Sequence, residues 1–585
     1  MLSQMVARYL RDVRIDEIMA HLVALTEHDR YQASLGIERA ADLIASAAEA
    51  IGLSHVAVER FTADGATRWW TFQAPRAWTP IIARLEIRAT GRCVLAVDHA
   101  AQPFTIATYS APTPTGGSIA RVACLNGDLT GAVAVVGPSD FARPELLAAL
   151  GARGAIGFVT DAPCRGEHPG RIELDASTSL FGFSITTAQR QAIEASPDAV
   201  AHVVVDVDRS ARMPVVTGVL PGRGTGEVWL TSHLCHPRPG ANDNASGAAA
   251  LLGVATALID RRDRQGDLDR SIRFVWGPEF LGVAALLCER FDRFGRDGRP
   301  LAVINLDMVG EDPVQCGVPL VVERTPDWCP SIITPLAEHV VEEVFAQTSA
   351  HPGTWRPGPF LGYSDHAVFA NFRDETWRSP AVQLWHPGDP FNHSAADSLD
   401  KVSAIELRRA TIAGAVLAEV LAGDGIATLE PVVQRWCDRE EHAAVVLAQR
   451  YSQIDQGAWS RRLLDHVRAQ GAALRAVVDD DPEAWRCPRR ATQRAFVGRW
   501  PGPFNYRGLL AELSANDRAG VVALFLAEKR NFAVLTHLAM LAEACGSRDE
   551  TIDAASLALR APIDAAAAGT LWSALLASGW IEETS

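Results

Sequence analysis

A short stretch of the chain, residues 231–247 (TSHLCHPRPGANDNASG), holds two histidines and an aspartate: His233, His236 and Asp243. Neutral imidazole and carboxylate are the ligands that zinc takes in sites built for hydrolysis. An apolar run precedes the stretch and a helix-like run of small residues follows it, so the polar side chains would stand at the carboxyl end of a strand, where open α/β sheets keep their active sites. A histidine near a strand end is more often structural, so the interpretation depends on later segments.

Four later segments also place polar side chains just beyond or between predicted elements. Glu279 and Asp307 each follow a predicted strand. Residues 362–366 (GYSDH) lie in a Gly/Pro-rich loop, and His393 precedes a predicted helix. A single strand-end aspartate is usually a cap or turn residue. Because the placement repeats in order through one α/β unit, we expect these side chains to converge on one site.

The elements that must position these residues alternate regularly from about residue 210. Near-continuous apolar strands that alternate with helices predict an α/β fold, with a mainly parallel, mixed sheet that is covered by helices on both faces. The predicted strands are 228–231, 272–276, 301–306 and 381–384, and the predicted helices are 246–259, 283–291, 332–345 and 404–421.

The composition is that of a globular protein and excludes several functions. A length of 585 residues suggests three or four domains. The net charge of -15 argues against a nucleic-acid role, and lysine occurs only at positions 401 and 529. No apolar run reaches the ~18 residues that span a membrane, and residues 1–12 carry charges where a signal peptide has its apolar core. Ten cysteines without a CxxC pair favour reduced thiols and a cytoplasmic location.

Together the motifs resemble the co-catalytic zinc aminopeptidases, in the clan that also holds glutamate carboxypeptidases and glutaminyl cyclases. The resemblance covers residues 210–425, about a third of the chain. It is greatest for an aminopeptidase-like subgroup in which a His-x-Cys-His-Pro motif precedes Ala-Asn-Asp-Asn and a winged helix closes the chain. It implies a zinc cofactor, as one or two ions, and a peptide or aminoacyl small-molecule substrate, with no membrane partner. A homo-oligomer is compatible with it.

The resemblance assigns roles to five residues. His233 matches the first ligand histidine, and Asp243 matches the aspartate that bridges two zinc ions. Asp307 matches the third ligand and His393 the last histidine. Glu279 matches the general base, because Trp-Gly-Pro-Glu-Phe-Leu-Gly aligns with the family's Trp-Gly-Ala-Glu-Glu-Leu-Gly.

Two positions depart from the family pattern. Phe280 stands where the family has a second glutamate that ligates one zinc, and Cys235 stands where it usually has an aspartate that supports the first histidine. One zinc site is therefore fully supplied, whereas the other needs a new ligand. His236 is our candidate, with a structural role as the alternative. The fallback ligands are Asp365, His366 and Glu311.

These assignments predict a zinc-dependent hydrolase that cleaves an amide bond near the free amino terminus of a peptide or aminoacyl conjugate. Glu279 would activate the water, and Tyr363 would help to hold the developing oxyanion, with ordinary packing as its alternative. One other reading is a mono-zinc cyclase, acyl-transfer enzyme or non-peptide amide hydrolase on the same scaffold. Another is a pseudo-enzyme that acts as a binding or regulatory module, against which the retained Glu279 argues.

Changes in the pattern of apolar residues, from helical to β-like spacing and back, divide the chain into four predicted domains. Residues 1–67 are predicted to be helices that pack on the catalytic domain, residues 210–425. Between them, residues 68–209 carry short β-like runs and a β-α-β unit, and resemble an inserted protease-associated domain, with a generic β-rich domain as the alternative. Residues 426–585 are helical. The spacing at 549–583 fits a winged-helix-like end with an interaction role, and an ordinary helical cap is the alternative.

Overall fold

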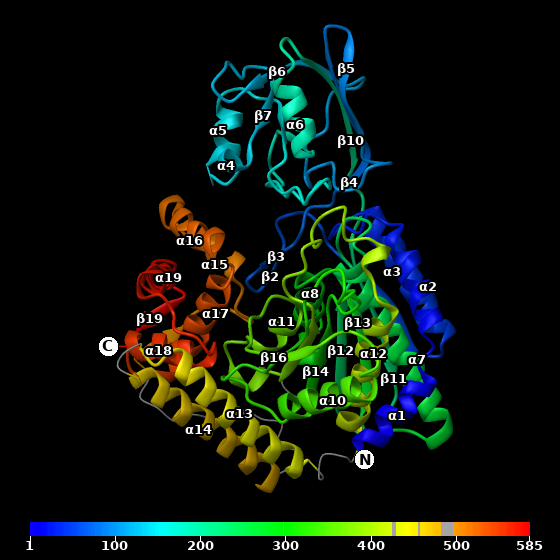
Figure 1. Ribbon diagram of the computed structural model, residues 1–585, viewed down its shortest axis with the longest axis vertical. Coiled ribbons are helices and arrows are strands. Elements are labelled where there is room, and N and C mark those ends of the chain that lie inside the picture. Colours follow the sequence, from blue (N-terminus) through cyan, green and yellow to red (C-terminus); the bar gives the residue numbers. More distant parts are fainter. Residues whose placement is uncertain (144, 296–297, 424–428, 454–456, 481–494, 585) are drawn as a thin grey trace.

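An eight-stranded sheet forms the centre of the computed structural model, which describes residues 1–143, 145–295, 298–423, 429–453, 457–480 and 495–584 (Figure 1). The strand order is β1-β11-β13-β12-β14-β17-β15-β16. The strands are β1 (Ser54–Phe61), β11 (Met213–Leu220), β12 (Glu227–His233), β13 (Ser271–Gly277), β14 (Ala302–Leu306), β15 (Leu320–Glu323), β16 (Trp355–Gly358) and β17 (Ala381–Trp385). The four central strands, β13, β12, β14 and β17, are parallel. At one edge β11 and β1 pair antiparallel with their neighbours, and at the other β15 pairs antiparallel with β17 and parallel with β16, which confirms the mainly parallel, mixed sheet.

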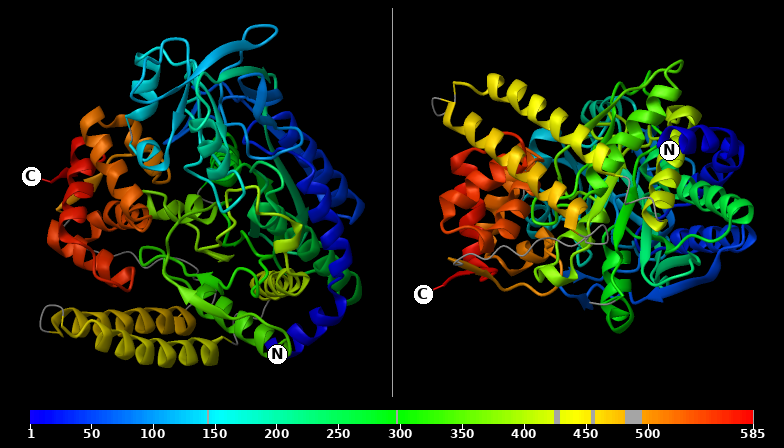
Figure 2. Two further views of the ribbon diagram at one scale, coloured as in Figure 1. Left: turned by 45° about the horizontal axis from the view of Figure 1, so that its top comes forward. Right: turned by 90° about the horizontal axis from the view of Figure 1, so that it is seen from below.

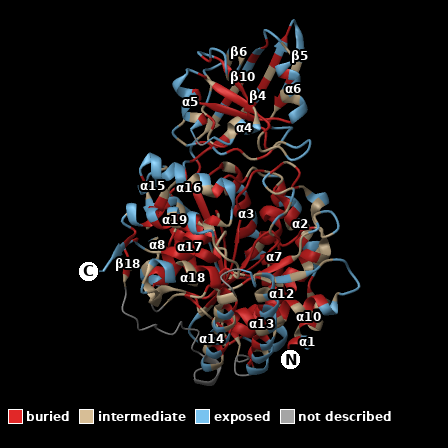
Figure 3. Ribbon diagram, turned by 60° about the vertical axis from the view of Figure 1, so that its left-hand side comes forward, coloured by how far each residue is buried: buried red, intermediate tan, exposed pale blue. Residues whose placement is uncertain are grey.

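Helices cover both faces of this sheet, which explains why its central strands are mostly apolar. Val228 and Leu230 of β12 pack in the core beneath α7 (Gly247–Gln265) and α12 (Ala404–Ala422). Trp229 points to the opposite face, into the core that contains α8 (Leu281–Glu289). Full burial of a valine or leucine side chain, such as those of Val228 and Leu230, stabilises a fold by about 1.5–3 kcal/mol. Figure 3 shows the resulting buried interior, with exposed residues on the outer faces of helices and in the surrounding loops.

The amino-terminal region contributes helices and one strand. Helices α1 (Leu2–Asp12), α2 (Ile15–Thr26) and α3 (Leu35–Ala50) join the same core as α7 and α12, together with α10 (Ile333–Gln347). The prediction that residues 1–67 are helices is wrong for β1, which pairs antiparallel with β11 at the edge of the central sheet. The strand depends on a partner more than 150 residues away, and local periodicity cannot reveal such a pairing.

A second, seven-stranded sheet stands apart from the first at the top of Figure 1, in the order β5-β4-β10-β6-β7-β8-β9. The elements of this inserted domain are β4 (Thr79–Ala89), β5 (Arg92–Asp98), β6 (Ser118–Cys124), β7 (Val133–Val136), α4 (Pro138–Phe141), α5 (Leu146–Ala152), β8 (Gly157–Thr160), β9 (Phe181–Ser184), α6 (Thr187–Glu194) and β10 (Val200–Asp208). Its entering and leaving strands, β4 and β10, pair antiparallel, so they form a two-stranded neck.

The hairpin of β2 (Arg68–Trp69) and β3 (Phe72–Gln73) does not belong to this second sheet. Trp69 and Phe72 are buried against α8, in the core of the catalytic domain. The boundary expected at residue 68 therefore lies closer to Thr79, because two large apolar side chains hold the hairpin on the catalytic domain.

The carboxyl-terminal region is helical apart from two short strands. A long antiparallel hairpin of α13 (Glu430–Arg450) and α14 (Ala458–Asp480) lies beneath the terminal helices (Figure 2). Those helices are α15 (Tyr506–Glu512), α16 (Ala515–Ala527), α17 (Asn531–Leu541), α18 (Arg548–Ala558) and α19 (Ala565–Ala577), with β18 (Phe496–Gly498) paired to β19 (Ile581–Glu583). Their core includes Trp328 and Phe360, so they dock directly on the catalytic domain. Among the described residues, no helix has both the length and the apolarity to cross a bilayer.

Candidate metal centre

The parallel strands bring the polar residues to one edge of the central sheet. His233 is the last residue of β12, Glu279 lies two residues beyond β13, and Asp307 directly follows β14. His233 pairs with Gly277 at the end of β13, so the ends of these strands lie side by side. The predicted convergence is thus a consequence of the register of three neighbouring strands.

A first donor set consists of His233, Asp243 and Asp307. His233 Nε2 lies 3.4 Å from Asp243 Oδ1 and 3.2 Å from Asp307 Oδ1, and all three side chains are buried. Tetrahedral zinc with bonds of about 2.0–2.2 Å holds neighbouring ligand atoms about 3.3–3.5 Å apart. The donor types and their spacing therefore fit zinc.

A second donor set shares Asp243 and adds His236 and His393. The two Nε2 atoms lie 3.3 Å and 3.2 Å from the Asp243 carboxylate, and the imidazole rings stack with their centroids 5.1 Å apart. However, Arg171 NH1 lies 3.1 Å from His236 Nδ1. A metal ion on Nε2 would leave the ring hydrogen on Nδ1, opposite a guanidinium that can only donate. The second set also has one carboxylate where the first has two, so it would hold a cation less tightly.

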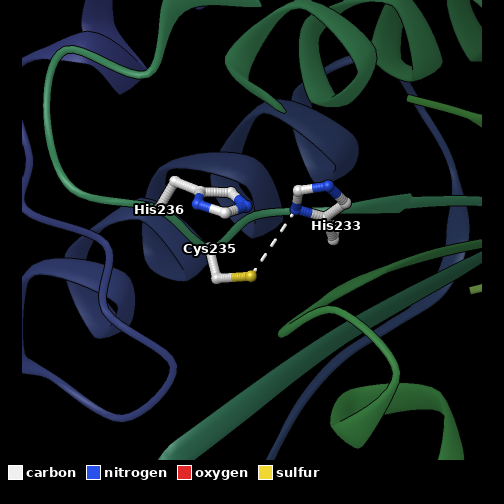
Figure 4. A group of neighbouring side chains, drawn as sticks. All are labelled: His233, Cys235 and His236. Atoms are coloured by element: carbon white, nitrogen blue, oxygen red, sulfur yellow. Dashed lines mark hydrogen bonds between the residues drawn. The ribbon is translucent and has the colours of Figure 1, made fainter. Parts of the chain in front are cut away.

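Neighbouring side chains hold these donors in place. Cys235 Sγ lies 3.5 Å from His233 Nδ1, on the far side of the ring from the donor atom (Figure 4). Asp397 accepts the backbone N–H of Asp243 at 3.0 Å and that of Asn242 at 2.7 Å. Contacts of this kind orient a ligand and adjust its affinity for metal. Cys235 thus occupies the position that the sequence predicted.

The backbone is strained at four positions around the centre. Phe280, Met308, His393 and His236 all have positive φ angles, of 57°, 52°, 60° and 142°. Residues other than glycine adopt such angles only when surrounding structure imposes them, and they cluster at active sites. For Met308 the imposed contact is a hydrogen bond from its N–H to the side chain of Asn244, at 3.0 Å.

Glu279 faces the same cavity as the first donor set. Its loop is fixed by two hydrogen bonds, from Glu279 N–H to Cys235 Sγ at 3.2 Å and from Phe280 N–H to Asp365 Oδ1 at 2.6 Å. Burial raises the pKa of Glu279 to about 7, with His233 lowering it and the nearby aspartates raising it. A carboxyl group that titrates near neutrality can both take and return a proton.

The remaining predicted residues have other contacts. Tyr363 lines the cavity, but its hydroxyl donates to the carbonyl oxygen of Lys529 at 2.8 Å. None of the three fallback ligands belongs to either donor set as the structure describes them. Asp365 accepts the N–H of Phe280, His366 Nε2 lies 2.8 Å from Glu323, and Glu311 groups with Cys316 and Asp389.

A cavity of about 660 Å³ lies over the donor atoms and has walls from three parts of the chain. Arg171 and Glu173 enter it from the inserted domain, and Arg507 and Lys529 enter from the carboxyl-terminal helices. Sequence reasoning missed all four residues. The single available signal was the rarity of lysine, which made position 529 conspicuous.

Comparisons with known proteins agree with this geometry. Residues 215–418 match the profile of peptidase family M28, and residues 49–313 match a domain of unknown function, DUF4910. BSAP, a zinc aminopeptidase from Bacillus subtilis, superposes with a TM-score of 0.50 at 20% identity over 70% of this chain and 96% of its own. A peptidase M28 precursor from Shewanella amazonensis SB2B superposes with a TM-score of 0.51 at 16% identity over 72% and 96%. At these identities the two structures show a shared fold. No curated protein matches the sequence.

The α/β fold, the two buried donor sets and the adjoining carboxyl group agree with the match to a peptidase family, because together they form a site that can hold a metal ion beside a proton acceptor. The match to peptidase family M28 covers residues 215–418, so the likeness is that of the catalytic domain.

Proposed function

We propose that this enzyme is an aminopeptidase, which removes a residue from the free amino terminus of a short peptide or aminoacyl conjugate. The observation that carries the proposal is the first donor set, with Glu279 beside it in a cavity that three parts of the chain line. A cavity walled by three domains favours a small substrate over the interior of a long chain. BSAP, whose fold is similar, is a zinc aminopeptidase, and this supports the same reaction here.

The protein's own residues would divide the work as follows. Zinc, when bound, supplies a Lewis acid that polarises the scissile carbonyl and makes water acidic near neutral pH. His233, Asp243 and Asp307 hold it, and Glu279 takes the proton of the attacking water and returns it to the leaving amine nitrogen. A base positioned in this way typically contributes a factor of roughly 100 to 10,000 in rate.

Glu279→Gln tests the proposal directly. Because glutamine has the same shape but cannot accept the proton, we expect kcat to fall by roughly 100- to 10,000-fold while zinc content stays that of the wild type. The assay compares aminoacyl amides with their N-acetylated forms, and hydrolysis should require the free amino group. The exposed Glu49→Gln on α3 is the matched control. Unchanged turnover in Glu279→Gln would reject Glu279 as the base, and equal cleavage of acetylated substrates would reject the aminopeptidase assignment.

A second candidate is a mono-zinc cyclase or acyl-transfer enzyme. Two observations favour it: Phe280 replaces a ligand of the second ion, and Arg171 contacts His236, the substitute ligand. Mass spectrometry of the products separates the two reactions, because hydrolysis adds one water to the substrate whereas cyclisation adds none.

A cytoplasmic location is part of the proposal. The nine cysteines within the described residues are all free thiols, which suits a reducing compartment.

A further inference from the structure

We propose that the cavity binds a carboxylate at the far end of the substrate, through Arg507 and Lys529. The inference rests on the proposed function and names its substrate class: peptides short enough that their own terminal carboxylate lies in the cavity with the scissile bond.

Arg507 lines the cavity, and its guanidinium has no hydrogen-bonding partner among the residues that the structure describes. The side chain is exposed and lies over two aromatic rings, with Cζ 5.8 Å from the centroid of Phe280 and 5.3 Å from that of Tyr506. No hydrogen bond or ion pair of its guanidinium appears among the described residues, unlike Arg171, whose NH2 pairs with Glu173 at 2.6 Å. The rings fix the plane of the guanidinium and leave its hydrogen-bonding edge available.

Lys529 has an anchored backbone carbonyl and an ammonium group that faces no carboxylate partner among the described residues. Its carbonyl oxygen accepts the Tyr363 hydroxyl at 2.8 Å, so the start of its side chain is anchored at the cavity wall. The ammonium makes no ion pair within the described part of the chain. The other lysine, Lys401, pairs with Asp400 outside the cavity.

The charges beside Arg507 and Lys529 favour a bound anion. These two basic side chains, which have no ion pair among the described residues, share a cavity of about 660 Å³. Glu279 and Glu173 are the acidic side chains near Arg507, and the first is committed to proton transfer while the second pairs with Arg171. A bound carboxylate would satisfy the arginine fork with two parallel hydrogen bonds and neutralise the lysine.

Geometry favours a terminal carboxylate. The donors stand at the strand ends of the catalytic domain, whereas Arg507 and Lys529 enter the cavity from the carboxyl-terminal helices. A substrate whose scissile carbonyl lies at the donors would therefore place its carboxylate at this basic pair. The volume is that of a site for a small ligand. An acidic side chain on the residue after the scissile bond carries the same group, and the experiment below separates the two sources.

The test uses the full-length zinc enzyme and three substrates: Ala-Ala with a free carboxylate, Ala-Ala-amide, and Ala-Glu-amide. We expect kcat/KM for Ala-Ala to exceed that for Ala-Ala-amide by roughly tenfold to a hundredfold, as charged hydrogen bonds typically give. Arg507→Gln and Lys529→Gln should each reduce the ratio of kcat/KM for Ala-Ala to kcat/KM for Ala-Ala-amide most of the way to one. Arg450→Gln is the matched control, because Arg450 is exposed and lies over Tyr451, outside the cavity.

The outcomes separate the inference from the function on which it rests. Equal cleavage of Ala-Ala and Ala-Ala-amide would overturn the terminal-carboxylate inference and leave the aminopeptidase proposal standing. A preference for Ala-Glu-amide over Ala-Ala would assign the cations to an acidic side chain and would also overturn it. If no substrate is cleaved, calorimetry on Glu279→Gln decides: tighter binding of Ala-Ala than of its amide, lost in Arg507→Gln, supports the inference, and equal binding overturns it.

Discussion

Asp243 is the residue on which both donor sets depend. The Nε2 atoms of three histidines, His233, His236 and His393, lie 3.2–3.4 Å from its carboxylate. Its backbone N–H is held by Asp397, so the carboxylate has little freedom to turn. A single side chain therefore fixes the distance between the two sets.

The first donor set has two carboxylates and the second has one. We therefore predict two zinc ions that are bound with different affinities. His236→Ala removes a donor that only the second set uses, so we expect metal content to fall from two ions per chain to one. Asp243→Ala should empty both. Elemental analysis after stepwise dialysis against a chelator measures this, and wild-type protein should release its second ion first.

The control for this prediction is His202→Ala, an exposed histidine on β10. It should keep the full metal content. A wild-type protein that binds a single ion, with His236→Ala unchanged, would instead make His236 a structural residue that donates to Asp243.

At the scale of elements, a short loop of the inserted domain contacts the segment that carries His393 of the metal centre. Gly170 pairs with Ser394 in an isolated bridge, and Arg171 N–H donates to the carbonyl oxygen of His393 at 2.7 Å. The loop that carries a metal-binding histidine is thus partly held by a different domain. The His393 side chain is 47% exposed, so these backbone contacts add to the restraint that Asp243 and the ring of His236 place on it.

Gly170→Ala tests this dependence. A Cβ at Gly170 would lie 1.9 Å from the carbonyl oxygen of Pro163, so the loop must shift. We expect kcat/KM to fall roughly tenfold, because small displacements of positioning groups are costly, while the melting temperature changes little. Gly137→Ala is the control, since its Cβ would meet nothing within 4 Å. Wild-type activity in Gly170→Ala would show that His393 does not need the inserted loop.

A second inter-domain contact joins helix α14 to the catalytic domain. His466 Nε2 lies 2.8 Å from Asp327, which is 13% exposed. Burial raises the pKa of Asp327, but the neighbouring His466 outweighs it and the pKa falls from 3.8 to about 2. A carboxyl group with a lowered pKa stabilises the folded state above its unfolded pKa, and that stability is lost as the pH falls from about 4 toward 2.

Asp327→Asn should therefore destabilise the protein by about 2 kcal/mol at pH 7. The difference from wild type should shrink as the pH is lowered from about 4 toward 2, because the carboxyl group is protonated in the folded protein only near the lower end of that range. Chemical denaturation across this pH range measures it. Asp263→Asn, at an exposed aspartate, should show no such dependence. A difference that stays constant with pH would assign the effect to packing.

At the scale of the whole molecule, the sequence predicts the elements whose signals are local. The strands that end at His233 and near Glu279 and Asp307 are continuous apolar runs, and their polar ends identify the edge of the sheet where the donors meet. The fold class and the zinc aminopeptidase family follow from these segments and are confirmed. The likeness of the two flanking domains to protease-associated and winged-helix modules stays a prediction.

The rest depends on contacts between distant segments. Nothing local marks β1 as a partner of β11, because Ser54–Phe61 is a half-exposed edge strand. Arg171 and Arg507 are ordinary arginines in the sequence, and they become cavity residues only when two other domains dock over the sheet. The position of such residues is a property of domain packing, which a pattern of residue types does not encode.

The three-part wall of the cavity has a consequence for protein synthesis. A nascent chain that has left the ribosome as far as β17 possesses every donor of the first set, and even the segment that holds His393 follows within a few residues. Arg507 and Lys529 emerge only more than a hundred residues later. Metal binding can therefore precede completion of the substrate site. The unfinished polypeptide would then have a metal centre before it has Arg507 and Lys529, the residues that we propose select the substrate.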